Sequence, residues 1–532
     1  MSEPETPPRA PAVVPEPTID MNDPDARNRA ISATLLPGFV GTSVPDALRT
    51  RFENGLGGVC IFGYNIESAQ QLEQLNDDIL SVAPLAVIAI DEEGGDVTRL
   101  NYADGSPYPG NAVLGRLDET ELTEKVGNSV GFALRRTSCT LDFAPDIDVN
   151  SNPDNPVIGV RSFGSDTALV ARHGAAATRG IQSAGIAACA KHFPGHGDTA
   201  LDSHLALPVI DRSLDELRER ELVPFRAAIE AGVLSIMTSH IVLPKVDPDA
   251  PATFSPRILQ GLLRDELGFD GVIVTDALDM KGASGETGIP EAAVRALRAG
   301  CDLLCIGSET TDELVGEVIA AIDAAITAGR LSAERVADAA GRVRALARRL
   351  ERLRSDIRAL PATQTGAPVG IERSQEAFDV RDGALDALRG DRPFAVVRIE
   401  TQANIAVGVA PWGPFAQTAA DPDAADSRAW AEHPEHIVAE VDAGQDAVLG
   451  GILAEVPEGF PVVVIGKAVH RYPFARRVVD TLRANRPTVV VDMGWPSDDR
   501  AYADVATFGA SRLLGRALMD LLDRTAASGD ER

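Results

Sequence analysis

Three histidines and two aspartates lie close together in residues 191–204. Residues Lys191–Thr199 read KHFPGHGDT, and Asp202-Ser203-His204 follows shortly after. The chain has only eight histidines, so a chance surface loop is a poor explanation for this concentration. The apolar run Gly185–Ala190 comes directly before it. An apolar strand that ends in ionisable groups is typical of a catalytic loop on a buried parallel strand.

The pair Asp202 and His204 has the residue types of a general acid/base. A nearby carboxylate can hold an imidazole in one tautomer and raise its basicity. Gly195 and Gly197 are expected to let this loop swing over a bound substrate. The alternative is a loop whose polar residues are incidental.

Asp276 directly follows the β-branched run Gly271–Thr275. A carboxylate fixed at the end of a strand can attack an electrophilic carbon as a nucleophile. An N-cap for the next segment would explain the same residue equally well.

A metal site is the competing interpretation of the histidine segment. His192, His196, Asp198, Asp202 and His204 could all ligate zinc or manganese. However, the first candidate strand, Ile31–Pro37, ends without a histidine, and no His-x-His pair occurs elsewhere. We therefore expect neither a metal nor a cofactor.

Eight short apolar runs between about Arg29 and Gly307 could form the strands that position these residues. They are Ile31–Pro37, Gly58–Phe62, Leu85–Asp91, Leu141–Val149, Gly185–His192, Leu234–His240, Gly271–Asp276 and Asp302–Ile306. Amphipathic stretches such as Ser213–Ala231 and Pro256–Leu267 separate most of them, as parallel strands require. Eight strand–helix units predict an α/β protein with a (β/α)₈ TIM-type barrel. An open doubly wound sheet is the alternative, but its GxGxxG fingerprint is missing.

A second, smaller α/β sandwich domain is expected after the barrel. Its predicted strands are Phe394–Ile399, Pro461–Gly466 and Thr488–Met493 in a small parallel sheet, with helices over Tyr472–Ala484 and Gly509–Leu522. Trp412 and Trp495 follow strand-like runs, and core packing is favoured over sugar contact for both. The expected organisation is a disordered acidic, proline-rich tail (1–27), the catalytic barrel (28–360), a linker (361–375) and the C-terminal domain (376–532).

The composition narrows the class of partner. The formal net charge of −29 argues against nucleic acid or an anionic membrane as a partner. The five cysteines, Cys60, Cys139, Cys189, Cys301 and Cys305, lie mostly in apolar runs, which predicts reduced, buried thiols. The sequence shows no signal-peptide pattern and no apolar stretch long enough to span a membrane, so a cytoplasmic location is expected.

The barrel region resembles glycoside hydrolase family 3, specifically its β-N-acetylglucosaminidase (β-N-acetylhexosaminidase) branch. DEEGGDVTR at Asp91–Arg99 looks like the family's DQEGGxVxR, with Glu92 in place of the usual glutamine. DVNSNPDNPVIGVRSFG at Asp148–Gly164 and KHFPGHGDT are long, nearly complete matches. TDALDM at Thr275–Met280 departs from the more frequent SDDLxM, and Ala277 removes a second carboxylate.

The resemblance implies a role for each matching residue. Asp276 would be the nucleophile, His204 the general acid/base and Asp202 its orienting partner. The side chains that hold the terminal sugar would be Asp91, Arg99, Arg161, Lys191 and His192. His196 would belong to the framework of the loop.

The resemblance therefore implies a retaining exo-β-N-acetylglucosaminidase that forms a glycosyl-aspartate intermediate. Its expected substrate is a small carbohydrate, with peptidoglycan-derived fragments favoured over chitin oligosaccharides. A family 3 β-glucosidase, an N-acetylglucosamine phosphorylase and a non-catalytic sugar-binding protein remain as alternatives. A phosphorylase stays open because a neutral histidine leaves less negative charge near the anomeric carbon than a glutamate would.

Overall fold

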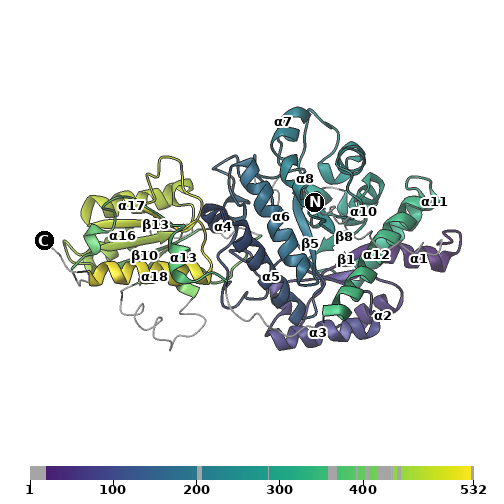
Figure 1. Ribbon diagram of the computed structural model, residues 1–532, viewed down its shortest axis with the longest axis horizontal. Helices are drawn as coiled ribbons and strands as arrows, with labels where there is room; N and C mark the ends of the chain where they lie inside the picture. The colour runs from purple at the N-terminus through teal and green to yellow at the C-terminus, as the bar shows by residue number, and fades with distance from the viewer. Residues whose placement is uncertain are drawn as a thin grey trace, which may run out of the picture.

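The eight predicted strands form a curled parallel sheet surrounded by helices (Figure 1). The computed structural model describes residues 19–199, 207–285, 287–357, 368–390, 393–401, 406–416, 433, 435–439 and 445–528. The strands are β1 (Leu35–Pro37), β2 (Gly58–Ile61), β3 (Val87–Ile90), β4 (Leu141–Asp142), β5 (Ala187–Phe193), β6 (Ser235–Thr238), β7 (Val272–Val274) and β8 (Leu304–Gly307).

Hydrogen bonds close these strands into a barrel. β2 to β7 form one continuous parallel sheet, and β1 pairs with β8. A bridge between Val274 and Leu303 links β7 to β8, and the Gly57 amide donates to the Ser32 carbonyl beside β1 and β2. The prediction of a (β/α)₈ barrel is confirmed.

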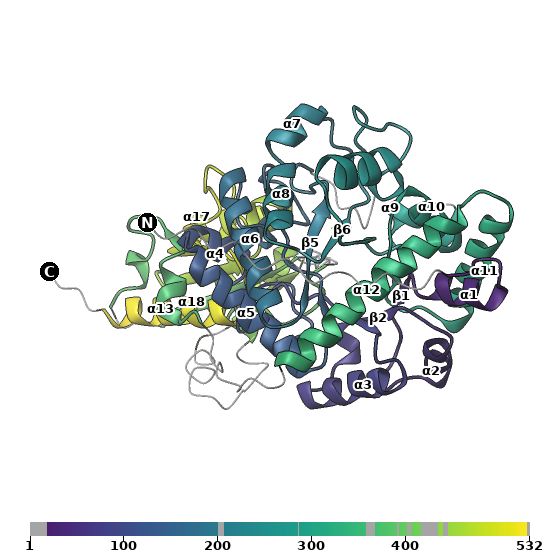
Figure 2. The ribbon, with the colours of Figure 1, turned by 45° about the vertical axis from the view of Figure 1, so that its right-hand side comes forward.

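Helices cover the outside of the barrel, and α5, α6 and α8 lie side by side on one flank (Figures 1 and 2). The helices are α1 (Pro24–Ser32), α2 (Asp46–Glu53), α3 (Ala69–Val82), α4 (Asn111–Leu117), α5 (Thr120–Arg136), α6 (Thr167–Ser183), α7 (Leu214–Glu219), α8 (Leu222–Glu230), the π-helix η4 (Arg257–Glu266), α9 (Lys281–Ser284), α10 (Gly288–Ala299), α11 (Asp312–Thr327) and α12 (Ala333–Ile357).

Helix α12 closes the end of the barrel opposite to the carboxyl ends of the strands. Its apolar residues Val343, Leu346 and Leu350 pack against the inward-facing side chains of the barrel strands. Arg354 donates to the Pro84 carbonyl, just before β3 begins. The opposite end of the barrel is therefore left for the site.

Two predicted elements differ from the structure. β4 is only two residues long because the Pro145 nitrogen carries no hydrogen to continue the ladder; the chain nonetheless runs on beside β5, where Ile147 donates to the Lys191 carbonyl. The expected helix over Ser213–Ala231 is broken into α7 and α8, and buried Glu221 lies at the break.

The C-terminal domain is a sheet with helices on both faces (Figure 1). Its strands are β9 (Asp379–Val380), β10 (Ala395–Glu400), β11 (Glu435–Ala439), β12 (Val462–Gly466), β13 (Thr488–Asp492) and β14 (Val505–Ala506), and its helices are α13 (Ile371–Gln375), α16 (Gln445–Glu455), α17 (Pro473–Asn485) and α18 (Arg512–Ala527). The strand order is β11-β10-β12-β13-β14-β9, and β9 runs antiparallel to β14. The three predicted strands, β10, β12 and β13, are parallel to one another as expected, and the unpredicted edge strand β9 makes the sheet mixed.

The two domains share part of one apolar core. Ala112 and Val113 of α4 belong to the cluster that includes Phe394, Val463 and the apolar face of α18. The ends of the two domains remain predictions. Helix α1 begins at Pro24, and α13 lies within the residues expected to be linker, of which 361–367 fall outside the described ranges.

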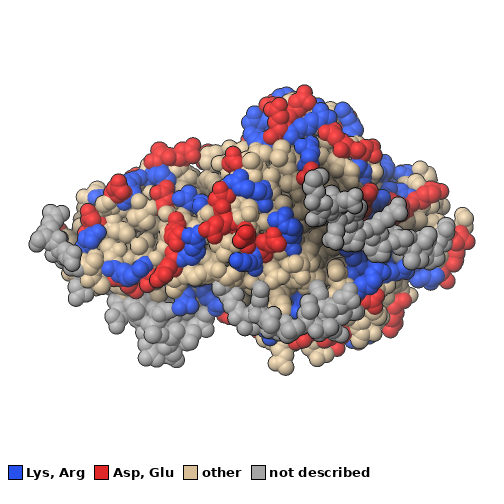
Figure 3. All heavy atoms as spheres, viewed as in Figure 1, with Lys and Arg blue, Asp and Glu red and all other residues tan. Residues whose placement is uncertain are grey.

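Charges of both signs alternate over the molecular face in Figure 3, and the described residues on this face form no extended basic patch. All five cysteines are buried free thiols, as predicted. No helix among the described residues is long and apolar enough to cross a membrane.

Candidate active site

A cavity of about 180 Å³ opens at the carboxyl ends of the barrel strands. Strand-end side chains make its polar wall, while apolar side chains such as Phe143 and Met237 make its floor. The charged and imidazole side chains that line it are Asp91, Glu93, Arg99, Arg161, Lys191, His192, His196, Asp276 and Asp279. The structure therefore brings together all the predicted site residues that it describes.

Asp276 lies two residues beyond the end of β7 and is partly exposed to the cavity. Its Oδ1 atom accepts a hydrogen bond of 2.8 Å from the Ala277 amide. The carbonyl oxygen of Ala277 lies 3.0 Å, within hydrogen-bond distance, from Nε2 of His240. His240 is buried and comes shortly after β6. The neighbouring strand thus holds the Asp276 segment in place.

Lys191 lies at the centre of the polar wall. Its ammonium is 2.8 Å from a carboxylate oxygen of Asp91 and 2.8 Å from one of Glu93. Burial alone would lower the pKa of Lys191, but these two carboxylates outweigh burial and raise it. A permanently charged lysine can donate to a sugar hydroxyl, and Asp91 can accept from one.

Arg161 is held by Glu93 through two hydrogen bonds, from Nε at 2.9 Å and from Nη2 at 2.7 Å. Burial would raise the pKa of Glu93, but the charges of Arg161 and Lys191 outweigh it and lower the pKa. Sequence reasoning missed Glu93. Its position as the third acidic residue directly after β3 was the available signal.

His192 is oriented by a buried carboxylate. Its Nδ1 atom lies 2.7 Å from Oδ2 of Asp148, and its Nε2 atom lies 3.4 Å from Nη2 of Arg161. Burial would raise the pKa of Asp148, but His192 and His196 outweigh it and lower the pKa. Asp148 is therefore a positioning residue that the sequence did not single out, although it begins the matched segment Asp148–Gly164.

The histidine loop is anchored as far as Thr199. The His196 amide donates to Asp148, and burial lowers the pKa of His196 to about 4. Asp198 pairs with Arg212 at 2.7 Å and with Arg220 at 2.6 Å. Asp202 and His204, the predicted acid/base pair, lie outside the described residues.

The two loop glycines lie in tightly packed surroundings. A Cβ atom at Gly197 would lie 1.7 Å from the Val149 carbonyl oxygen. At Gly195, where φ is +125°, it would lie 2.5 Å from Cγ of Glu221. Any side chain would displace these neighbours, so both positions require glycine for packing; the expectation that they let the loop swing stays a prediction.

The C-terminal domain reaches the rim of the cavity. Arg99 donates a hydrogen bond of 2.8 Å to the Ala406 carbonyl, and its guanidinium lies 3.8 Å from Asp91. Glu92 does not face the cavity: it is buried and accepts from Thr98 and from the amides of Arg99 and Leu100. Glu92 therefore holds the loop that carries Arg99.

One group of side chains has the types and spacing of a metal site. Ligand atoms of Asp146, Asp148 and His192 all lie within 4.8 Å of one another. In this structure Arg161 approaches Asp146 at 3.5 Å, and His192 faces Asp148 through a ring nitrogen. A guanidinium and an imidazole thus already interact with these two carboxylates.

A (β/α)₈ barrel with charged side chains around a cavity at the strand ends is the architecture of a barrel enzyme. The sequence pattern of the glycosyl hydrolase family 3 N-terminal domain matches residues 48–346. The chain therefore belongs to glycoside hydrolase family 3.

Individual relatives agree with this assignment. The chain is 39% identical over 299 residues to a β-hexosaminidase of Thiobacillus denitrificans, covering 54% of this chain and 81% of that one. It is 34% identical over 353 residues to β-hexosaminidase A of Pseudoalteromonas piscicida, covering 62% of this chain but only 58% of the relative. A solved family 3 β-N-acetylglucosaminidase from Paenibacillus is 30% identical, with a TM-score of 0.79, over 94% of this chain and 97% of that one. These relatives place the chain in the β-N-acetylglucosaminidase branch of the family.

Proposed function

We propose that this protein is a retaining exo-β-N-acetylglucosaminidase. The observation that carries the proposal is the position of Asp276, which lines the same small cavity as Asp91, Lys191 and His192. A cavity of about 180 Å³ suits one terminal sugar better than a longer chain. The β-hexosaminidase names of the relatives support N-acetylglucosamine as that sugar.

Asp276 would attack the anomeric carbon while His204 gives its proton to the departing oxygen. The glycosidic C–O bond breaks, and the sugar becomes an ester of Asp276. Water then attacks the same carbon, His204 takes a proton from it, and Asp276 leaves as a carboxylate. Two displacements at one carbon return the original β configuration.

The polar wall would hold the hydroxyl groups of the terminal sugar. Lys191 and Arg161 supply charged donors, and Asp91 supplies an acceptor. Because Glu93 and Asp148 already fix Arg161 and His192, these side chains need little rearrangement when the sugar binds.

The natural substrate in this proposal is a peptidoglycan-derived fragment in which N-acetylglucosamine is linked to N-acetylmuramic acid. The cytoplasmic location remains a prediction from the sequence.

Kinetics on 4-nitrophenyl β-glycosides of N-acetylglucosamine and of glucose test the proposal. We expect kcat/KM to favour the N-acetylglucosaminide, and proton NMR to detect the β anomer of the sugar as the first product. A preference for the glucoside would identify a β-glucosidase, and a first product in the α configuration would rule out retention. Formation of N-acetylglucosamine 1-phosphate in phosphate buffer would identify a phosphorylase, while binding without turnover would leave only a sugar-binding protein.

A further inference from the structure

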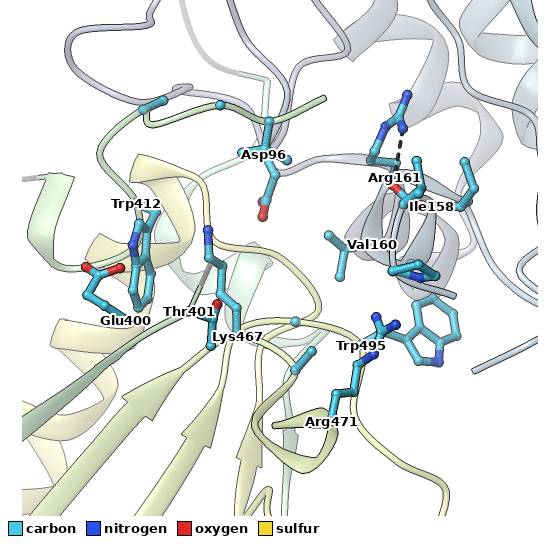
Figure 4. Close-up of a pocket in the computed structure, with 18 of the residues that line it drawn as sticks. Asp96, Ile158, Val160, Arg161, Glu400, Thr401, Trp412, Lys467, Arg471 and Trp495 are labelled. Atoms are coloured by element: carbon cyan, nitrogen blue, oxygen red, sulfur yellow. Dashed lines mark hydrogen bonds between the residues drawn. The ribbon is translucent and has the colours of Figure 1, made fainter. Parts of the chain in front are cut away.

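A second cavity, of about 760 Å³, lies between the barrel and the C-terminal domain (Figure 4). The barrel contributes Asp96 and residues 155–161, and the C-terminal domain contributes the ends of its parallel strands. Thr401 follows β10, Lys467 follows β12, and Trp495 comes shortly after β13.

The sheet topology marks this place as a ligand site. In the order β11-β10-β12-β13, the chain leaves β10 toward β11 on one side and leaves β12 toward β13 on the other. The connections therefore diverge between β10 and β12. In open α/β sheets, ligands bind outside the carboxyl ends of the strands at such a switch point, which here is the position of Thr401 and Lys467.

Lys467 supplies a cation that faces Asp96 across the cavity, and Asp96 and Glu400 act on its charge from a distance. Its side chain is half-buried, and its ammonium lies 4.9 Å from the ring centre of Trp412. Figure 4 shows the ammonium pointing across the cavity toward Asp96. Within the described part of the chain it makes no hydrogen bond and no ion pair. Burial lowers the pKa of Lys467, so a bound anion would stabilise its charged form.

Arg471 is a second cation, and among the described residues it forms no ion pair. Its guanidinium donates to the carbonyls of Asn155 at 2.8 Å and Asp154 at 2.5 Å, both of which are neutral acceptors. Arg398, by contrast, pairs with the carboxylate of Glu400. Among the described residues, neither cation forms a direct ion pair with a carboxylate, although Asp96 and Glu400 also line the cavity.

The cavity also has an aromatic wall and continues the active site. Trp495 is partly exposed and can contact the apolar face of a sugar. Val157 and Arg161 line both cavities, and the adjacent residues Ala406 and Val407 line one cavity each. A sugar linked to the residue held beside Asp276 could therefore extend from the first cavity into the second.

We propose that the second cavity binds the leaving-group sugar and that Lys467, assisted by Arg471, selects a leaving group that carries a carboxylate. This inference rests on the proposed β-N-acetylglucosaminidase activity. It gives the C-terminal domain a part in substrate choice, since Lys467 and Arg471 both belong to that domain.

The test compares two disaccharides with the same terminal sugar, using the full-length protein. In one, N-acetylglucosamine is β-1,4-linked to N-acetylmuramic acid, and in the other it is linked to N-acetylglucosamine. We expect Lys467→Met to lower the acidic-to-neutral ratio of kcat/KM by about tenfold or more, which corresponds to the loss of a hydrogen bond to a charged group. Lys467→Arg should restore part of the ratio. The control Lys125→Met, on the exposed side of α5, should leave it unchanged.

A second measurement needs no variant. Conversion of the muramic carboxylate to its methyl ester should lower kcat/KM of the unaltered protein by a similar factor. An unchanged ratio in Lys467→Met together with an unaffected ester would overturn the inference. So would equal losses on both disaccharides accompanied by phosphate inhibition, which would indicate a free-anion site. If the unaltered protein cleaves neither disaccharide nor the aryl N-acetylglucosaminide, the proposed function itself fails.

Discussion

Arg161 and Glu93 form a bidentate ion pair, with hydrogen bonds of 2.9 and 2.7 Å, between the loops that follow β4 and β3. Both side chains are only 4% exposed, so the pair is shielded from solvent. The ammonium of Lys191 also lies 2.8 Å from a carboxylate oxygen of Glu93. One carboxylate thus holds two cations of the cavity in place before any sugar binds.

Glu93→Gln should destabilise the protein and weaken substrate binding. The neutral amide leaves Arg161 and Lys191 without a shared counter-charge, and breaking a buried ion pair typically costs about 3–5 kcal/mol. We expect a loss of about 3 kcal/mol in the free energy of unfolding, measured with urea, and a raised KM. The control is Glu124→Gln, which removes the exposed pair with Arg179 and should cost less than about 1 kcal/mol. Equal effects of the two variants would contradict a special role for Glu93.

Asp276→Ala should abolish turnover because it removes the carboxylate proposed to form the glycosyl ester. We expect kcat to fall by about 10⁴-fold or more, as when other catalytic nucleophile systems are dismantled. Added azide can attack from the emptied side and should give an α-glycosyl azide, detectable by NMR. Asp279→Asn, at the same cavity, should keep the retaining outcome. Azide products in the β configuration from Asp276→Ala would contradict the assignment.

His204→Ala should separate substrates according to their leaving groups. A nitrophenolate departs without a proton, whereas a sugar alcohol needs one. We expect the variant to lose about 10²–10⁴-fold in kcat on a disaccharide and to keep much of its activity on an aryl glycoside. Steady-state kinetics on both substrates measure this difference. Equal losses would exclude His204 as the acid/base.

Glu92→Gln should change how stability depends on pH. Burial raises the pKa of Glu92 to about 7, from an ordinary value near 4.5. The unfolded chain loses this proton near pH 4.5 and the folded chain near pH 7. Wild-type stability therefore falls across that window as the pH rises, by about 3 kcal/mol. The glutamine variant lacks this loss.

We therefore expect the variant's stability relative to the wild type to increase from pH 4.5 to 7 and then to level off. Urea unfolding at several pH values measures it. Glu73→Gln, on the exposed side of α3, provides the comparison. Parallel profiles for Glu92→Gln and the wild type would show that Glu92 is not protonated in the folded protein.

Removal of metal ions should leave activity unchanged. Asp146, Asp148 and His192 have suitable spacing for a metal, but Arg161 and His192 already interact with the two carboxylates. We expect full activity on the aryl N-acetylglucosaminide after treatment with EDTA. Loss of activity that zinc or manganese restores would instead identify a metal-dependent hydrolase.

The barrel could be predicted because its strands carry their own signal. Parallel strands buried on both faces need continuous apolar runs, and each run here ends where a polar loop begins. The long matches Lys191–Thr199 and Asp148–Gly164 added the family and several of the cavity residues, among them Arg161, Lys191 and His192. Some strand lengths could not be predicted from the sequence. Strand β4 is shorter than expected because of Pro145, and strands β9 and β14, with two residues each, are too short to show an apolar pattern.

The sequence by itself therefore determined the barrel, the nucleophile candidate Asp276 and the cluster around Lys191. Only the tertiary structure decided how these groups are held and what lies beside them. Glu93 binds Arg161, which lies 68 residues later in the sequence. Arg99 donates a hydrogen bond to Ala406, which lies 307 residues later. Lys467 faces Asp96 of the barrel from another domain. Such contacts depend on how strand ends and domains come together in space, and no local spacing or apolar period in the sequence records that arrangement.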